Sequence, residues 1–195
     1  SPYLKLFIQI IIASLMYALN IKFDALDISF LNFGIDLLIL PNWLAYILSV
    51  LWIVGITNSI NWLDGLDGLA SGISIIISSG LLLIFFYFGQ LDLAFILISL
   101  SGASMGFLRF NFYPAKILMG DGGSFFLGGL LSLVSLNGLS SINPELELLL
   151  LPVHIIIFLF LIPIVDLTFV TISRLIEGKS PFNPDRRHIH HKLLE

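Results

Sequence analysis

The chain contains no cysteine and little charge. None of its 195 residues is a cysteine, which excludes a disulfide framework and a metal site built from thiolates. Charged residues make up 11% of the chain, whereas a soluble domain has about 25%. Hydrophobic residues make up 57%, and the mean hydropathy is +1.02. This composition excludes a soluble enzyme, a nucleic-acid-binding protein and a disordered chain, and it predicts an integral membrane protein.

Six apolar stretches are candidates for membrane-spanning helices, each of which needs roughly 17–25 mostly apolar residues. They cover residues 4–19, 43–60, 69–88, 93–108, 124–139 and 148–170. The polar stretch 22–41 alternates at Asp27-Ile28-Ser29-Phe30, which predicts a short β-hairpin outside the bilayer. The expected fold is therefore an all-α polytopic bundle of about six transmembrane helices with this hairpin, forming a single membrane-embedded domain over residues 1–195.

The distribution of lysine and arginine predicts the orientation. If the spans thread alternately, one side receives Lys5, Arg109, Lys116, Arg174, Lys179, Arg186, Arg187 and Lys192. The other side receives only Lys22. The positive-inside rule places the richer side in the cytoplasm. We therefore expect a multi-pass protein of the inner (plasma) membrane, with segments 61–68, 109–123 and 174–195 facing the cytoplasm and the hairpin on the extracytoplasmic side.

The first cytoplasmic loop carries polar side chains at three-residue intervals, namely Asn58, Asn61, Asp64 and Asp67. On a continuous helix this spacing keeps all four within half a turn of one face, and Gly65 and Gly68 are expected to interrupt the helix. The alternative is that Asp67 only N-caps the next span while the asparagines bond to neighbouring carbonyls. Because unpaired polar groups in a membrane are costly, two acids and two amides together favour a functional role.

The second loop places Asp121 among Gly120, Gly122 and Gly123. The glycines permit unusual backbone conformations and leave the carboxylate uncrowded, as a ligand of a hard cation needs. The helix that follows presents its positive N-terminus to an anion. Here too the alternative is an N-cap, formed by Asp121 or Ser124.

The third cytoplasmic segment combines arginines with three histidines in four positions, His188, His190 and His191. Guanidinium groups suit bidentate contact with phosphate, which favours an anion site. The alternatives are a topology signal alone, a patch for anionic lipid headgroups, and a zinc site formed by the histidines.

Together, these segments carry groups suited to phosphoryl transfer at a membrane surface. Carboxylates and asparagine can hold Mg²⁺, which prefers oxygen ligands and bridges substrate phosphates. Arginine and histidine can neutralise those phosphates. The location favours one soluble and one lipid substrate. A secondary transporter is the alternative from another class, although its ionisable residues would be expected near the bilayer midplane, often within internal repeats.

Residues 58–69, 111–129 and 163–194 resemble, in the same order, the motifs of the polyprenyl-phosphate N-acetylhexosamine-1-phosphate transferases of glycosyl transferase family 4. The resemblance implies transfer of a sugar 1-phosphate from a UDP-sugar to undecaprenyl phosphate with release of UMP, the first membrane step of a cell-envelope glycan pathway. His-Ile-His-His at 188–191 resembles the branch that uses UDP-GlcNAc. The phospho-N-acetylmuramoyl-pentapeptide transferases of peptidoglycan synthesis, which usually have three consecutive histidines, are the second choice.

The resemblance also implies a role for each matching residue. Asp121 would bind Mg²⁺ or Mn²⁺, with Asn61 as a second contact. The implied catalytic residues are Asp64, Asp67, Asp121, His190 and His191. The implied substrate-binding residues are Asn58, Asn61, Asn111, Arg174, Arg186 and His188. The adjacent Asp-Asp motif of the family would precede Ser1, and further spans are expected on both sides. We therefore expect the chain to be truncated at both ends and inactive by itself.

Overall fold

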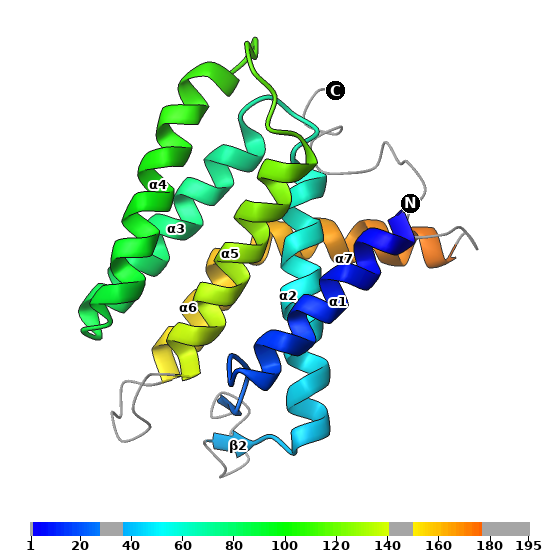
Figure 1. Ribbon diagram of the computed structural model, residues 1–195, viewed down its shortest axis with the longest axis vertical. Coiled ribbons are helices and arrows are strands. Elements are labelled where there is room, and N and C mark those ends of the chain that lie inside the picture. Colours follow the sequence, from blue (N-terminus) through cyan, green and yellow to red (C-terminus); the bar gives the residue numbers. More distant parts are fainter. Residues whose placement is uncertain (1, 28–36, 141–149, 177–195) are drawn as a thin grey trace.

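The computed structural model describes residues 2–27, 37–140 and 150–176, and in these ranges the chain is mostly helical (Figure 1). The helices are α1 (Pro2–Ala18), α2 (Asn42–Leu63), α3 (Leu69–Tyr87), α4 (Leu91–Asn111), α5 (Gly120–Ser140), α6 (Leu150–Leu159) and α7 (Leu161–Ile176). The first five run up and down in one bundle. The α2–α3 loop (64–68) and the α4–α5 loop (112–119) lie together at one end, which we call the loop end (Figure 1).

Four of the described helices are long and apolar enough to cross a membrane, namely α2, α3, α4 and the Gly120–Leu139 part of α5. A helix satisfies its own backbone hydrogen bonds, which is what a segment in lipid requires. This confirms the prediction of a multi-pass helical membrane protein. Helix α1 is apolar but has 17 residues, and α6 has 10. The predicted number of six spans is therefore not confirmed and stays a prediction.

The predicted sixth span, residues 148–170, is not one continuous helix. Helix α6 ends at Leu159, and α7 begins at Leu161 and runs across the bundle instead of along it (Figure 1). Pro163 accounts for the break, because it has no N–H to donate to the carbonyl of Leu159 and its ring crowds that carbonyl. In the first turn of a new helix the missing N–H does no harm, since that group has no intrahelical partner.

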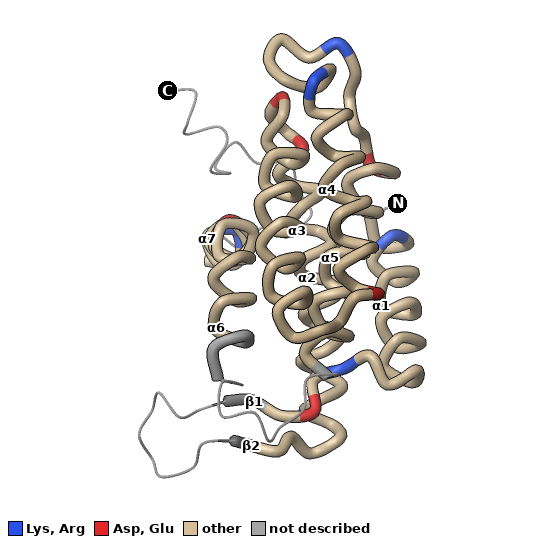
Figure 2. The backbone as a smooth tube through the Cα atoms, turned by 90° about the vertical axis from the view of Figure 1, so that its left-hand side faces the viewer, with Lys and Arg blue, Asp and Glu red and all other residues tan. Residues whose placement is uncertain are grey.

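Two short strands lie at the end of the bundle opposite the loop end (Figure 2). Strand β1 (Ala25–Asp27) pairs antiparallel with β2 (Leu37–Ile39), and Ala25 faces Ile39. The pair falls within the stretch where the sequence predicts a hairpin. Residues 28–36, which would hold its turn, lie outside the described residues, so the hairpin as a whole stays a prediction.

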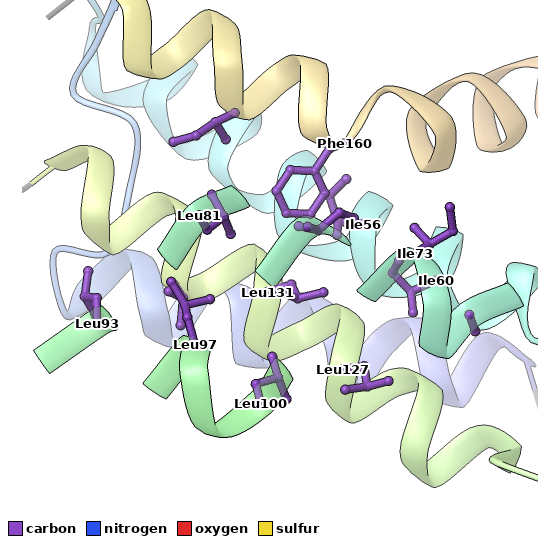
Figure 3. Packing of buried hydrophobic residues seen from close by; sticks show 14 of the residues in the cluster. Ile56, Ile60, Ile73, Leu81, Leu93, Leu97, Leu100, Leu127, Leu131 and Phe160 are labelled. Atoms are coloured by element: carbon purple, nitrogen blue, oxygen red, sulfur yellow. The ribbon is translucent and has the colours of Figure 1, made fainter. Parts of the chain in front are cut away.

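The apolar core lies where α2, α3, α4 and α5 meet, and the kink between α6 and α7 closes it (Figure 3). Ile56 and Ile60 of α2, Leu97 of α4 and Leu131 of α5 are buried there, and Phe160 fills the space beside the kink. Helices in lipid gain little from the hydrophobic effect, so their association depends on close packing. Gly128 of α5 shows this closeness, because an added Cβ would lie 2.8 Å from the Cα of Thr57 on α2.

We expect Gly128→Ala to force α2 and α5 apart, because the new methyl group would meet backbone atoms that cannot move aside. Overpacking of this kind typically costs about 1–3 kcal/mol. Thermal unfolding in detergent measures the loss. The control is Gly102→Ala on the exposed side of α4, where nothing lies within 4 Å of the added carbon. Its midpoint should stay the same or rise slightly, because alanine favours a helix. Equal midpoints for the two variants would contradict the close contact.

Candidate active site

The charged residues of the four spanning helices lie only at helix ends. Helices α2 and α3 carry none, and those of α4 and α5 are Asp92, Arg109 and Asp121, each in a first or last turn. Figure 2 shows the same separation, with most charged positions at the two ends of the bundle. The loop end holds Asp64, Asp67, Arg109, Lys116 and Asp121. The candidate site is at this end.

Asp121 is the point where three helices meet. It lies in the first turn of α5, which begins at Gly120 in the left-handed conformation (φ +66°) that favours glycine. Its exposed carboxylate forms a salt bridge with Lys5 of α1. Asn61 of α2 donates from Nδ2 to Oδ1 of Asp121 at 3.1 Å and to Oγ of Ser124 at 2.7 Å. Asp121 and Ser124 lie inside α5, so neither is its N-cap.

Lys5 is a site residue that the sequence pattern does not indicate, because its place in the sequence predicts only the orientation of the chain. Its ammonium contacts Asp121 and lies 5.5 Å from the centroid of the Phe125 ring. The two charged residues are 116 positions apart, so no motif or spacing connects them. They meet because α1 packs along α2 and brings its first turns to the start of α5.

Asp64 is a half-buried carboxyl at the start of the α2–α3 loop. It is the C-cap of α2, which ends at Leu63 just before Gly65, as predicted. Burial raises the pKa of Asp64, and the negative charge of Asp121 raises this pKa further, whereas a hydrogen bond from the backbone of Gly120 lowers it in part. A carboxyl whose pKa is shifted by burial and by a neighbouring charge is typical of functional sites.

Asp67 connects the two loops directly. Its Oδ2 accepts a hydrogen bond from the backbone N–H of Ala115 at 2.9 Å. The alternative that Asp67 only N-caps the next span is wrong, because the N-cap of α3 is Gly68 in the left-handed conformation (φ +78°), with no side-chain cap. Asp67 therefore acts on the α4–α5 loop and not on the helix that follows it.

Asn111 makes the second connection between the loops. Its side chain is 2% exposed, and its Oδ1 accepts hydrogen bonds from the N–H of Gly68 at 3.1 Å and the hydroxyl of Ser71 at 3.2 Å. Its Nδ2 donates to the carbonyl of Ile117 at 3.0 Å. The predicted role of Asn111 in substrate binding stays a prediction. What its contacts show is a buried amide that holds the end of α4, the start of α3 and the α4–α5 loop together.

Asn58 lies on α2 and contacts α1, whereas Arg174 lies on α7 and contacts α2. Asn58 exchanges hydrogen bonds with Gln9 of α1, and its Nδ2 lies 2.7 Å from Oε1 of Gln9. Arg174 is 3% exposed, and its guanidinium carbon lies 5.2 Å from the centroid of the Trp62 ring. Their predicted substrate contacts stay predictions. The remaining predicted residues, Arg186, His188, His190 and His191, lie outside the described residues.

The donor groups at the loop end fit Mg²⁺ better than a zinc ion. Among the described residues no group of three or more histidines or acids could hold a metal by itself. Asp121 nevertheless offers an exposed carboxylate, Asn61 an amide beside it and Asp64 a second carboxyl. Mg²⁺ is usually bound by one or two carboxylates, with water and substrate phosphates as the other ligands. Asn61 would present its oxygen after an amide flip, since the two ends of an amide have nearly the same shape.

We expect Asp64→Asn to stabilise the protein at neutral pH. A raised pKa means that the folded state favours the neutral carboxyl, so this stabilisation is present at low pH and is lost as the pH rises through the raised pKa. Asparagine stays neutral, so its unfolding midpoint in EDTA should exceed that of the wild type at pH 7, and the difference should shrink towards pH 4. Asp92→Asn, an exposed acid at the opposite end, is the control. A difference between the two unfolding midpoints that grows as the pH falls would contradict the raised pKa of Asp64.

Comparison with known proteins gives the family of the chain. The family model for glycosyl transferase family 4 matches residues 1–139, which include both loops and α1. The chain is 39% identical, over its full length, to the probable undecaprenyl-phosphate N-acetylglucosaminyl 1-phosphate transferase of Bacillus subtilis (strain 168), and covers 52% of it. It is 32% identical, over 96% of its length, to the decaprenyl-phosphate N-acetylglucosaminephosphotransferase of Mycobacterium leprae (strain TN), and covers 50% of it.

A third relative aligns over a shorter stretch. The phospho-N-acetylmuramoyl-pentapeptide-transferase of Listeria monocytogenes serotype 4b (strain CLIP80459) is 43% identical over 122 residues, which are 63% of this chain and 36% of that protein. The chain spans about half the length of the relatives that match it throughout. The family match over most of the chain and the relatives that align along its full length show that it belongs to glycosyl transferase family 4.

Proposed function

We propose that this protein transfers an N-acetylhexosamine 1-phosphate from a UDP-sugar to a polyprenyl phosphate and releases UMP. The observation that carries the proposal is the convergence of Lys5, Asn61 and Asp121 beside Asp64 at the loop end of a membrane bundle. The family supports it, because the relatives named for the transfer of N-acetylglucosamine phosphate align over 96% or more of the chain.

The main obstacle to this reaction is electrostatic. A phosphate monoester has a second pKa near ~6, so the lipid phosphate is mainly dianionic at neutral pH and needs no strong general base. We propose that one of its oxygens attacks the β-phosphorus of the UDP-sugar directly. The bond from that phosphorus to the bridging oxygen breaks, and UMP leaves with the oxygen. Because both reactants are negatively charged, the protein has to lower their repulsion.

Several residues of the loop end would help to lower the repulsion between the two phosphates. Lys5 supplies a fixed positive charge next to Asp121, where a phosphate oxygen can reach it. Asp121, with Asn61 and Asp64, would hold Mg²⁺. This ion, when bound, supplies further positive charge for the two phosphates. Asp67 and Asn111 keep the loops in place. We assign Arg174, Arg186 and the histidines His188, His190 and His191 to phosphate contacts.

We propose that the loop end faces the cytoplasm from the inner membrane. Of the described basic residues, Lys5, Arg109 and Lys116 lie towards the loop end, Arg174 lies over Trp62 near the end of α2, and Lys22 lies towards the strands. The positive-inside rule then points the loop end inwards. The soluble nucleotide sugar would arrive from this side, and the lipid phosphate would approach within the bilayer.

The donor that we propose is UDP-GlcNAc. Relatives named for N-acetylglucosamine phosphate transfer match the chain from end to end, whereas the muramoyl-pentapeptide transferase matches 63% of it. The muramoyl-pentapeptide donor therefore remains the second candidate. The transporter alternative loses its support, because the chain belongs to a family of transferases.

A lipid-extraction assay tests the proposal. Membranes that contain the whole protein are given UDP-GlcNAc labelled on its β-phosphate, undecaprenyl phosphate and Mg²⁺. We expect label in the organic phase and UMP in the aqueous phase, both lost on addition of EDTA. Asp121→Asn should lower kcat by about 100-fold or more, the usual cost of losing a preorganised charge-stabilising group, with the unfolding midpoint nearly unchanged. Asp92→Asn, at the opposite end, is the control.

The other outcomes are equally clear. Label that enters the lipid only with the muramoyl-pentapeptide donor would establish the second candidate. If well-folded protein transferred no phosphosugar from any UDP donor, the proposed function would be wrong.

A further inference from the structure

Helix α1 carries Lys5 but packs only lightly against the bundle. The structure describes all of α1, and Ala13 is its one buried residue. Large apolar side chains of this helix, such as Phe7 and Leu15, are 60% and 56% exposed. Helices in lipid associate through close packing and through hydrogen bonds between side chains, because lipid tails are as apolar as a neighbouring helix. With so little packing, the rotation of α1 about its own axis depends on its polar contacts.

The position of the Lys5 ammonium depends on this rotation. The tip of a side chain lies about 5–6 Å from its helix axis, so a rotation of about 30° moves it by about 3 Å. A displacement of that size takes the ammonium out of hydrogen-bonding distance of the Asp121 carboxylate, with which it forms its salt bridge. A contact that fixes the rotation of α1 is most effective when it lies close to Lys5.

Gln9 makes such a contact with Asn58 of α2. Gln9 follows Lys5 by one helical turn, so both lie on the same face of α1, and both line the groove between α1, α2 and α5. Asn58 precedes Asn61 by nearly one turn, so these two share a face of α2. The contact between Gln9 and Asn58 therefore lies one turn below the group formed by Lys5, Asn61 and Asp121.

The hydrogen bonds of Asn58 give this contact a fixed direction. The Nδ2 of Asn58 donates to Oε1 of Gln9 at 2.7 Å and to the carbonyl of Val54 at 2.7 Å. Its Oδ1 lies 3.4 Å from Nε2 of Gln9. The backbone carbonyl holds the Asn58 side chain in one orientation, and Asn58 in turn holds Gln9. These bonds use both hydrogens of the Asn58 amide, with which it would otherwise bind a substrate oxygen.

We propose that Gln9 and Asn58 are positioning residues, which set the rotation of α1 on α2 and thereby hold Lys5 at Asp121. In this assignment Asn58 acts through Gln9 and Lys5 and does not touch a substrate. The consequence for transfer rests on the proposed function, in which Lys5 lowers the repulsion between the two phosphates. The consequence for the contact between Lys5 and Asp121 does not rest on it, so the two can be tested separately.

Carbodiimide coupling measures the contact between Lys5 and Asp121 without any substrate. The reagent activates a carboxylate, a neighbouring amine attacks the activated carbon, and an amide forms with release of a urea, so only groups in contact are joined. The whole protein is treated in detergent, and the linked peptides are quantified by mass spectrometry. Gln9→Leu keeps most of the side-chain volume but removes the amide. We expect it to lower the yield of the link about fivefold, within the range for losing one hydrogen bond between membrane helices.

Tyr46→Phe is the matched control. It also removes a hydrogen bond between α1 and α2, since Oη of Tyr46 lies 2.9 Å from Oγ of Ser14, but Ser14 is more than two helical turns from Lys5. Its coupling yield should equal that of the wild type. Exchanging the two amides, Gln9→Asn with Asn58→Gln, keeps their combined length and should restore the coupling. Unchanged coupling in Gln9→Leu, an equal loss in Tyr46→Phe, or an exchange variant as low as Gln9→Leu would overturn the proposal.

The transfer assay gives a second readout. We expect Gln9→Leu to lower kcat about tenfold, because a misplacement of about 1 Å can cost up to about 100-fold, whereas Tyr46→Phe should keep the wild-type rate. All variants are measured well below their unfolding midpoints, and Gln9→Met replaces Gln9→Leu if the latter does not fold. Lost coupling with an unchanged kcat would overturn the proposal that the contact serves the reaction. Coupling that depends on Gln9 in a protein without transfer would reject the proposed function and leave the positioning of Lys5 standing.

Discussion

The site depends on one buried amide, that of Asn111. Loops that join spanning helices at a membrane surface have few apolar contacts to fix them, so side-chain hydrogen bonds have to set their positions. Asn111, at the end of α4, bonds to Gly68 of the α2–α3 loop, to Ser71 of α3 and to Ile117 of the α4–α5 loop. Asp67 adds a bond between the two loops. Because the Asn111 side chain is 2% exposed, breaking its bonds would be costly. Gly120 is thereby held within hydrogen-bonding reach of Asp64.

This arrangement separates residues that hold the site from residues that face its ligands. Asn111 and Asp67 bond to neighbouring segments and hold them together, whereas Asp121 and Lys5 are exposed and paired with each other. Asp64 lies between these groups, half-buried and close to a second acid. The chemistry therefore concentrates on a small surface where α1, α2 and α5 meet. An apolar groove between α1, α2 and α5 begins at the same surface, with Lys5 and Asp121 at one end.

The sequence predicts the positions of the spanning helices well because each is a long uncharged stretch bounded by polar loops. It also predicts the end of α2 before Gly65, since glycine and two acids mark it clearly. The sequence does not indicate the role of Lys5, because its partner Asp121 is 116 positions away. The two residues meet only because of the way α1 packs in the bundle. The sequence also does not show that Asp67 and Asn111 hold the loops together, because aspartate and asparagine occur both as ligands of substrates and metals and as structural hydrogen-bonding residues. The kink before α7 was overlooked because hydropathy continues unchanged through Pro163.

Mn²⁺ binding tests most directly whether Asp121 binds the metal ion while Asp67 only holds the loops together. Electron paramagnetic resonance of the purified protein would follow free Mn²⁺ at neutral pH in the wild type, Asp121→Asn and Asp67→Asn. We predict one site that Asp121→Asn abolishes and Asp67→Asn retains, because an asparagine carbonyl at 67 can still accept the N–H of Ala115. Binding that survives in Asp121→Asn, or that is lost equally in both variants, would contradict this account.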